Sequence, residues 1–112
     1  MSNGDSRRSL YRVIYPVAER PTFDMDGLLH EVVDCSEVAL RYEVADRRIP
    51  KVGAQIKGIV KFRRGARAEV NGEVLRARAG LVVLTLAPPG ISFSDILLEQ
   101  RYLRGKGFTL KD

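Results

Sequence analysis

The residues of this sequence that are best suited to ligand chemistry lie in two short polar clusters. The first contains Arg7, Arg8 and Arg12, where a polar N-terminal segment meets apolar sequence. The second contains Asp34 and Ser36, between two stretches rich in apolar residues. The planar guanidinium group of arginine forms paired hydrogen bonds with phosphate and with the O6 and N7 atoms of guanine. The first cluster is therefore typical of a site for an anionic ligand, whereas Asp-x-Ser is also a common turn sequence.

One pair of residues, Cys35 and His30, has the chemistry of a nucleophile and its base. The alternative is a small cysteine half-buried between strands, and we favour it. The sequence contains no Walker phosphate loop, no Gly-x-Ser-x-Gly elbow and no His-Glu-x-x-His zinc motif. One cysteine and one histidine also fall short of the ligand set of a structural zinc site. We therefore expect a binding module that has neither catalytic residues nor a metal cofactor.

The charge of the chain indicates an anionic partner. It carries 19 Lys and Arg against 14 Asp and Glu, a net charge of +5, and its pI is about 9.7. Nucleic acid, a phosphate-bearing small molecule and an acidic protein surface all fit this balance. Aromatic residues make up only 7% of the chain and do not alternate with basic ones as in a base-stacking surface. Nucleic acid is therefore the least favoured partner, and a steep salt dependence of oligonucleotide binding would reveal it.

Length and composition favour one small domain. The chain has 112 residues, of which 45% are hydrophobic, enough to form a core. Because Cys35 is the only cysteine, an intramolecular disulfide is excluded. No apolar run approaches the roughly 18 residues of a membrane span, and residues 1–8 do not begin a signal peptide. We expect a soluble, cytoplasmic protein.

Alternating apolar and polar residues, separated by turn residues, predict a mainly β fold. We expect strands over residues 11–15, 28–33, 39–44, 55–62, 66–70, 73–78 and 81–86, with turns at Asp26-Gly27, Arg63-Arg64-Gly65, Asn71-Gly72 and Ala79-Gly80. Residues 19–25 are expected to be irregular. Apolar residues between Ile91 and Leu103 recur near helical spacing and predict a terminal helix, with Ser92 or Ser94 as its N-cap and Gly105 as its C-cap. This pattern predicts a small antiparallel barrel or sandwich with one terminal helix packed against it.

The order of the two polar clusters, and their place in this β pattern, resemble the PilZ family. The two signatures of that family are Arg-x-x-x-Arg and Asp/Asn-x-Ser-x-x-Gly. This sequence has Arg8-x-x-x-Arg12 followed by Asp34-x-Ser36. The resemblance implies a six-stranded antiparallel barrel with a C-terminal α-helix. It places the domain at residues 5–105, between flexible segments at residues 1–4 and 106–112.

The same resemblance implies that the protein binds cyclic di-GMP, a bacterial second messenger, and passes the signal to a partner protein. In this family the arginines close over the ligand, while the aspartate accepts hydrogen bonds from guanine and the serine contacts a base or a phosphate. Carried onto this chain, the binding residues are Arg7, Arg8, Arg12, Asp34, Ser36 and Ala39.

Ala39 departs from the second signature, because the family has glycine at this position. Glycine would permit a positive φ or a close approach of the ligand to the backbone. If a positive φ is required, alanine costs on the order of 1 kcal/mol. If the alanine Cβ meets the ligand, the loss of affinity is larger. The alternative function is therefore an adaptor of the same fold that binds proteins without a nucleotide.

Overall fold

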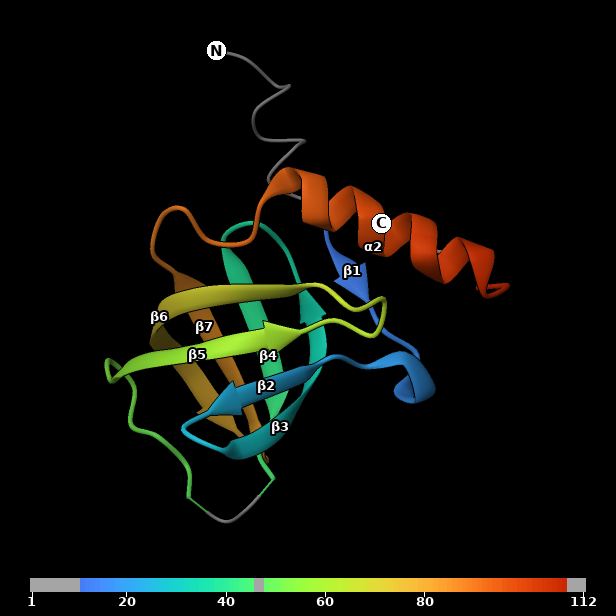
Figure 1. Ribbon diagram of the computed structural model, residues 1–112. Coiled ribbons are helices and arrows are strands. Elements are labelled where there is room, and N and C mark those ends of the chain that lie inside the picture. Colours follow the sequence, from blue (N-terminus) through green and yellow to red (C-terminus); the bar gives the residue numbers. More distant parts are fainter. Residues whose placement is uncertain (1–10, 46–47, 109–112) are drawn as a thin grey trace.

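The computed structural model describes residues 11–45 and 48–108, and these form an antiparallel barrel with one α-helix across its end (Figure 1). In chain order the elements are β1 (Val13–Ile14), the short 3-10 helix η1 (Val17–Glu19), β2 (Thr22–Met25), β3 (Leu28–Cys35), β4 (Ala39–Glu43), β5 (Gln55–Lys61), β6 (Arg67–Arg78), β7 (Leu81–Leu86) and α2 (Phe93–Gly105).

All strand pairings are antiparallel, and they close the sheet. The hydrogen-bonded order is β1-β3-β2-β5-β6-β7-β4, and β4 pairs with β3 to complete the circle. Strand β1 continues along the edge of β3 beyond the end of β2, so six strands form the barrel and β1 extends it. The prediction of a mainly β fold, with a six-stranded antiparallel barrel and a C-terminal helix, is confirmed.

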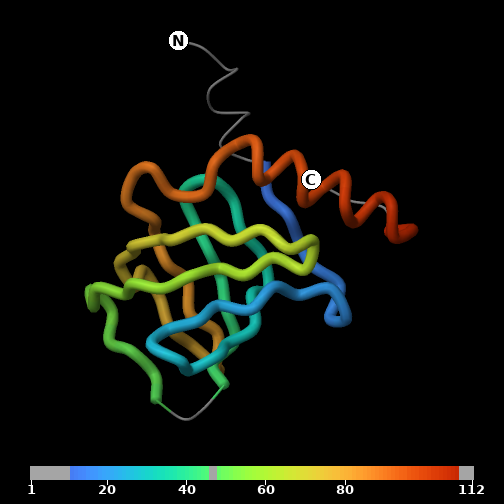
Figure 2. Tube along the Cα trace, viewed as in Figure 1, coloured from blue at the N-terminus to red at the C-terminus, as the bar shows by residue number. Residues whose placement is uncertain are grey.

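Helix α2 lies across one end of the barrel, beside β1 (Figure 2). Its N-cap is Ser92, one of the two predicted residues, whose hydroxyl accepts a hydrogen bond from the backbone N–H of Asp95 at 3.0 Å. The helix ends at Gly105 and its C-cap is Lys106, one residue later than predicted, because Gly107 takes the positive φ of 93°. No helix in the described part of the chain is long and apolar enough to cross a membrane.

Two predictions about the strands are wrong. The Asn71-Gly72 pair does not reverse the chain, because both residues lie inside the long strand β6. Gly72 pairs with β5 on one side and β7 on the other, and a Cβ there would lie 3.0 Å from the carbonyl oxygen of Thr85. The glycine permits close packing rather than a turn. Residues 22–25, expected to be irregular, form β2, since Phe23 is fully buried and the strand pairs on both edges.

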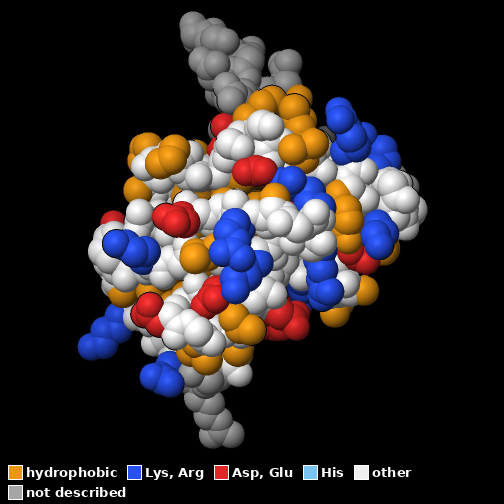
Figure 3. All heavy atoms as spheres, viewed as in Figure 1, with side chains coloured by type: hydrophobic (Ala, Val, Ile, Leu, Met, Phe, Trp, Pro, Cys, Tyr) orange, Lys and Arg blue, Asp and Glu red, His pale blue; other side chains and the backbone are white. Residues whose placement is uncertain are grey.

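The face formed by β2, β5 and β6 carries interspersed basic and acidic side chains (Figure 3). Lys61, for example, pairs with Asp24 at 3.0 Å between neighbouring strands. This face does not present the continuous basic strip expected of a surface that tracks a nucleic-acid backbone.

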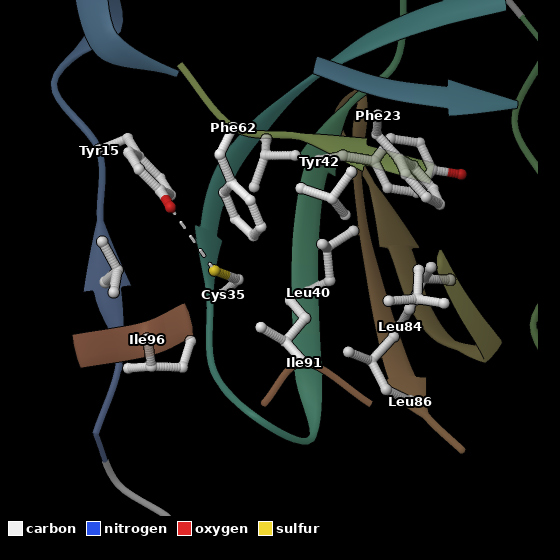
Figure 4. Packing of buried hydrophobic residues seen from close by; sticks show 14 of the residues in the cluster. Tyr15, Phe23, Cys35, Leu40, Tyr42, Phe62, Leu84, Leu86, Ile91 and Ile96 are labelled. Atoms are coloured by element: carbon white, nitrogen blue, oxygen red, sulfur yellow. Dashed lines mark hydrogen bonds between the residues drawn. The ribbon is translucent and has the colours of Figure 1, made fainter. Parts of the chain in front are cut away.

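The hydrophobic core fills the barrel and continues under α2. Figure 4 shows Phe23 and Tyr42 at one end of the core, where their tilted rings lie 5.1 Å apart between centroids, and Ile91 and Ile96 at the other. The last two residues come from the loop before α2 and from its first turns, and both are fully buried. Helix α2 therefore closes the barrel with its apolar face. The position of β1 between α2 and β3 brings that helix close to the polar residues identified from the sequence.

Candidate ligand-binding pocket

One pocket of about 260 Å³ gathers the sequence-predicted site residues that the structure describes. It lies on the outside of the barrel, and its walls are Arg12, Asp34, Cys35, Ser36, Val38, Ala39, Leu40, Arg41, Arg76 and Val83. Four of the six predicted residues are among them. The other two, Arg7 and Arg8, fall outside the described residues. The sequence did not single out Arg41 and Arg76, which this pocket adds to the site.

Asp34 reaches the outer face through a β-bulge in β3. His30 and Val32 are buried inside the barrel, and strict alternation would place Asp34 inside as well. The register between β3 and β4 shifts between Val32 and Asp34, so that Asp34 pairs with Arg41 and Cys35 faces the core instead. Bulges are common next to functional sites because they redirect a side chain in this way.

The carboxylate of Asp34 is held by Arg41 on the neighbouring strand. Its Oδ2 atom accepts hydrogen bonds from the Nε of Arg41 at 2.9 Å and from Nη2 at 2.5 Å. The Asp34 side chain is only 7% exposed, whereas that of Arg41 is 38% exposed. Both bonds fall on one carboxylate oxygen, so Oδ1 remains able to accept a hydrogen bond from a ligand.

Arg76 reaches the same face through a second bulge. Along β6, Val70, Gly72 and Val74 are buried and alternate with exposed residues. Continued alternation would place residue 76 inside the barrel. The register with β7 instead shifts between Val74 and Arg76, which leaves both Leu75 and Arg76 exposed. The alternation of buried and exposed side chains along β6 therefore shifts by one residue just before Arg76.

The two bulges bring charged side chains into one row across five strands. Asp34 of β3 is paired with Ile14 of β1 on one side and with Arg41 of β4 on the other. The row continues through Val83 of β7, which pairs with both Arg41 and Arg76. With neighbouring strands about 4.8 Å apart, the backbones at Asp34 and Arg76 are separated by roughly 14 Å along the sheet.

The turn between β3 and β4 forms one wall of the pocket. Its Ser36 backbone N–H donates to the carbonyl of Ala39 at 2.9 Å, and the Ser36 hydroxyl accepts from the N–H of Val38 at 3.3 Å. Ser36 thus orders its own turn. Gly90 packs against this turn so closely that a Cβ would meet the carbonyl oxygen of Glu37.

Ala39 occupies an ordinary extended position at the start of β4, where it pairs with Thr85. Among the described residues other than glycine, only Asp26 and Ala79 have a positive φ. The concern that Ala39 is strained by a positive φ is therefore removed. Its Cβ remains a potential contact for a ligand, because Ala39 lines the pocket.

The segment that contains β1, residues 11–15, presents Arg12 to the pocket and its alternate residues to the opposite side. Arg12 and Ile14 are exposed, whereas Val13 and Tyr15 are buried. On the buried side, the Tyr15 hydroxyl donates to Oε1 of Glu99 in α2 at 2.5 Å. Before the strand, the Tyr11 ring stacks on Phe93 at the start of α2, with centroids 5.7 Å apart.

A buried polar network continues from Tyr15 into α2. Glu99 is 1% exposed, and its second oxygen accepts a hydrogen bond from Arg64 at the tip of the β5–β6 hairpin. Arg64 also pairs with Asp95 one turn earlier in the helix. Burial raises the pKa of Glu99, and Asp95 raises it further, while the hydrogen bonds from Tyr15 and Arg64 oppose the shift. The network ties α2 to both β1 and the hairpin.

Cys35 and His30, which the sequence suggests as a possible nucleophile and base, are both buried in the barrel. Cys35 is 1% exposed and points toward Tyr15, with 3.9 Å between sulfur and hydroxyl oxygen (Figure 4). Burial raises the pKa of the Cys35 thiol to about 12, so the thiolate is scarce at neutral pH. The Nδ1 atom of His30 accepts a hydrogen bond from the backbone N–H of Ala45. Residues 11–45 and 48–108 contain no group of three side chains able to hold a metal ion.

A larger hollow of about 820 Å³ lies between the ends of β2 and β5, beside β6. Its wall includes Asp24, Asp26, Lys57 and Glu69. Asp24 is already bound by Lys61 and by the backbone N–H of Gly27. This hollow is larger than the pocket at Asp34, but it contains no arginine, whereas the smaller pocket contains three.

Comparison with known proteins gave no match to any family, to any curated protein or to any solved structure.

Proposed function

We propose that this protein is a cyclic di-GMP receptor that binds its ligand at the pocket around Asp34 and signals through a partner protein. The observation that supports this function is the meeting of Arg12, Asp34 and Ser36, from two separate sequence clusters, in one pocket. Cyclic di-GMP carries two phosphates and two guanines, and these residues have the matching hydrogen-bonding groups.

In this proposal the Oδ1 atom of Asp34 accepts hydrogen bonds from the N–H groups of one guanine. Arg41 keeps the carboxylate in place and balances its charge. Arg12, which makes no hydrogen bond or ion pair with another described residue, contacts a phosphate or the O6 and N7 atoms of the base. The half-buried side chains of Ala39 and Val83 offer apolar surface to the base.

The proposed signal passes through β1. This strand has two residues and, within the described part of the chain, pairs only with β3, so few backbone hydrogen bonds to described residues hold it. A ligand bound at Arg12 adds contacts on one side of β1, while Tyr11 and Tyr15 contact α2 on the other. Ligand binding would thus stabilise one arrangement of β1 and α2, which a partner could recognise.

Isothermal titration with cyclic di-GMP tests the proposal. The wild-type protein should bind saturably, whereas Arg12→Ala and Asp34→Asn should each lose at least about tenfold in affinity. Arg78→Ala is the matched control, because Arg78 is an exposed arginine of β6 that does not line the pocket. An excess of GTP should not displace the ligand. Absence of wild-type binding at millimolar ligand would overturn the function.

An adaptor that binds protein without a nucleotide is the second candidate. It is favoured by the bond between Asp34 and Arg41, since the buried carboxylate has a charged partner without any ligand. The two candidates differ in one measurable quantity. Cyclic di-GMP should protect the backbone amides of residues 5–12 from hydrogen exchange in a receptor, and should leave their exchange unchanged in an adaptor.

A further inference from the structure

The arginine at position 76 lies at the far end of the row that begins at Asp34. Its guanidinium group makes no hydrogen bond or ion pair with another described residue, although it lines the same pocket as Arg12 and Asp34. An exposed arginine without a partner is by itself ordinary. What distinguishes Arg76 is the β-bulge in β6 that directs its side chain into the pocket.

Strands β3 and β6 are not neighbours, but a bulge in each shifts the alternation of its side chains by one residue. Both shifts direct a charged side chain into the same pocket. The bulge in β3 turns Asp34 outward, and the bulge in β6 turns Arg76 outward, on either side of β4 and β7. Each bulge interrupts its ladder and adds local twist, so it reduces strand pairing. One such bulge could be a packing adjustment. Two bulges that aim charged residues at one pocket indicate that both residues contact the same ligand.

The spacing of the row indicates what kind of ligand this is. Asp34 and Arg76 are three strands apart, roughly 14 Å along the sheet, and Arg41 and Val83 lie between them. A single base held by Asp34 covers only part of this distance. A ligand that reaches both ends needs a second phosphate or a second purine. Arg76 can pair with the first or stack on the second.

We infer that Arg76 is a ligand-contacting residue that makes this a two-ended site, selective for a dinucleotide over a mononucleotide. This inference rests on the proposed function, because it assigns the second half of cyclic di-GMP to Arg76. The Asp34 end holds one guanine, and the Arg76 end holds the other guanine or its phosphate. Arg12 lies on the β1 side, opposite Arg76, so the two arginines flank the bound ligand.

The test compares Arg76→Ala with Arg78→Ala, using cyclic di-GMP and GMP as the probes. Both arginines are exposed on β6, so neither substitution should unfold the protein. We expect Arg76→Ala to weaken cyclic di-GMP binding by at least about tenfold, and Arg78→Ala to change it less than twofold. GMP should bind both variants as weakly as it binds the wild type, because it uses only the Asp34 end.

Nuclear magnetic resonance adds a readout that does not depend on affinity. In the wild type, cyclic di-GMP should shift the side-chain Nε–Hε signal of Arg76 together with the amide of Asp34, whereas GMP should shift only the latter. Wild-type binding of cyclic di-GMP that Arg76→Ala leaves unchanged would overturn this inference alone. A wild-type protein that binds neither nucleotide would overturn the proposed function as well.

Discussion

The Tyr15 hydroxyl group provides a quantitative test of how β1 is attached to α2. Tyr15→Phe removes only that hydroxyl, which donates to the buried Glu99 at 2.5 Å. Because Glu99 is 1% exposed, water cannot easily replace the lost donor. Loss of a hydrogen bond to a buried carboxyl group costs about 2 kcal/mol of unfolding free energy. With an unfolding entropy of about 2.1 cal/mol/K per residue, that cost lowers the Tm of a 112-residue chain by roughly 8 °C.

Tyr102→Phe is the matched control for this measurement. Tyr102 also donates its hydroxyl to a glutamate of another element, Glu19 in η1, at 2.7 Å. Both of these residues are half-buried, so water can take the place of the hydroxyl. The expected loss is about 0.5 kcal/mol, or roughly 2 °C. Thermal and urea unfolding followed by circular dichroism would measure both variants.

Equal losses in the two phenylalanine variants would refute the argument from burial. The same two variants also test whether β1 couples the pocket to α2, through their affinity for cyclic di-GMP. If β1 links the pocket to α2, Tyr15→Phe should also weaken cyclic di-GMP binding, although Tyr15 does not line the pocket. Tyr102→Phe should leave the affinity unchanged. A destabilised Tyr15→Phe protein that binds the ligand normally would show that β1 does not transmit the coupling.

Three further substitutions test separate parts of the structure. Gly58→Ala should lower the unfolding free energy by about 1–3 kcal/mol in a urea titration, because the added Cβ would lie 2.6 Å from the Phe23 ring. Its control is Gly105→Ala, which should be neutral or stabilising because the space around Gly105 is open. Ala39→Gly should cost about 0.5–1 kcal/mol of stability and should not raise ligand affinity severalfold in calorimetry, since position 39 is extended. Glu99 has a raised pKa in the folded protein, so it binds its proton more tightly there than in the unfolded chain. As pH falls from the raised pKa toward 4.5, the unfolding free energy of the wild type should therefore rise relative to that of Glu99→Gln. A difference in unfolding free energy between the two proteins that stays constant over this pH range would contradict the raised pKa of Glu99.

Local sequence pattern was sufficient to predict the fold class. Alternation along residues 39–44, 55–62 and 81–86 marks strands β4, β5 and β7, and the terminal helical spacing marks α2. These signals depend on neighbours within one element, so they can be read without knowing what packs against it. Asn71-Gly72 misled the prediction for the opposite reason. The residues that pair with Gly72 from β5 and β7 decide its conformation, and these are distant in the sequence.

The candidate site was predictable only in part, because strand register is a property of two strands. Arg12, Asp34 and Ser36 could be identified from their types and order. Arg41 and Arg76 could not, since nothing local shows that they share a row with Asp34. A weak signal does exist. Two adjacent apolar residues precede a charged one in both Val32-Val33-Asp34 and Val74-Leu75-Arg76, and both sites are bulges.

The placement of β1 explains how so small a fold could connect a ligand to a protein surface. Successive side chains of a strand point to opposite sides, so β1 and the residue on either side of it, residues 12–15, are enough to contact two partners. Here the exposed side carries Arg12 into the pocket, and the buried side carries Tyr15 to Glu99. If β1 transmits this coupling, a ligand that stabilises β1 from the pocket also stabilises the attachment of α2, and by linkage a partner that favours this position of α2 strengthens ligand binding. Under the proposed function, affinity for cyclic di-GMP is therefore expected to depend on whether the partner is bound.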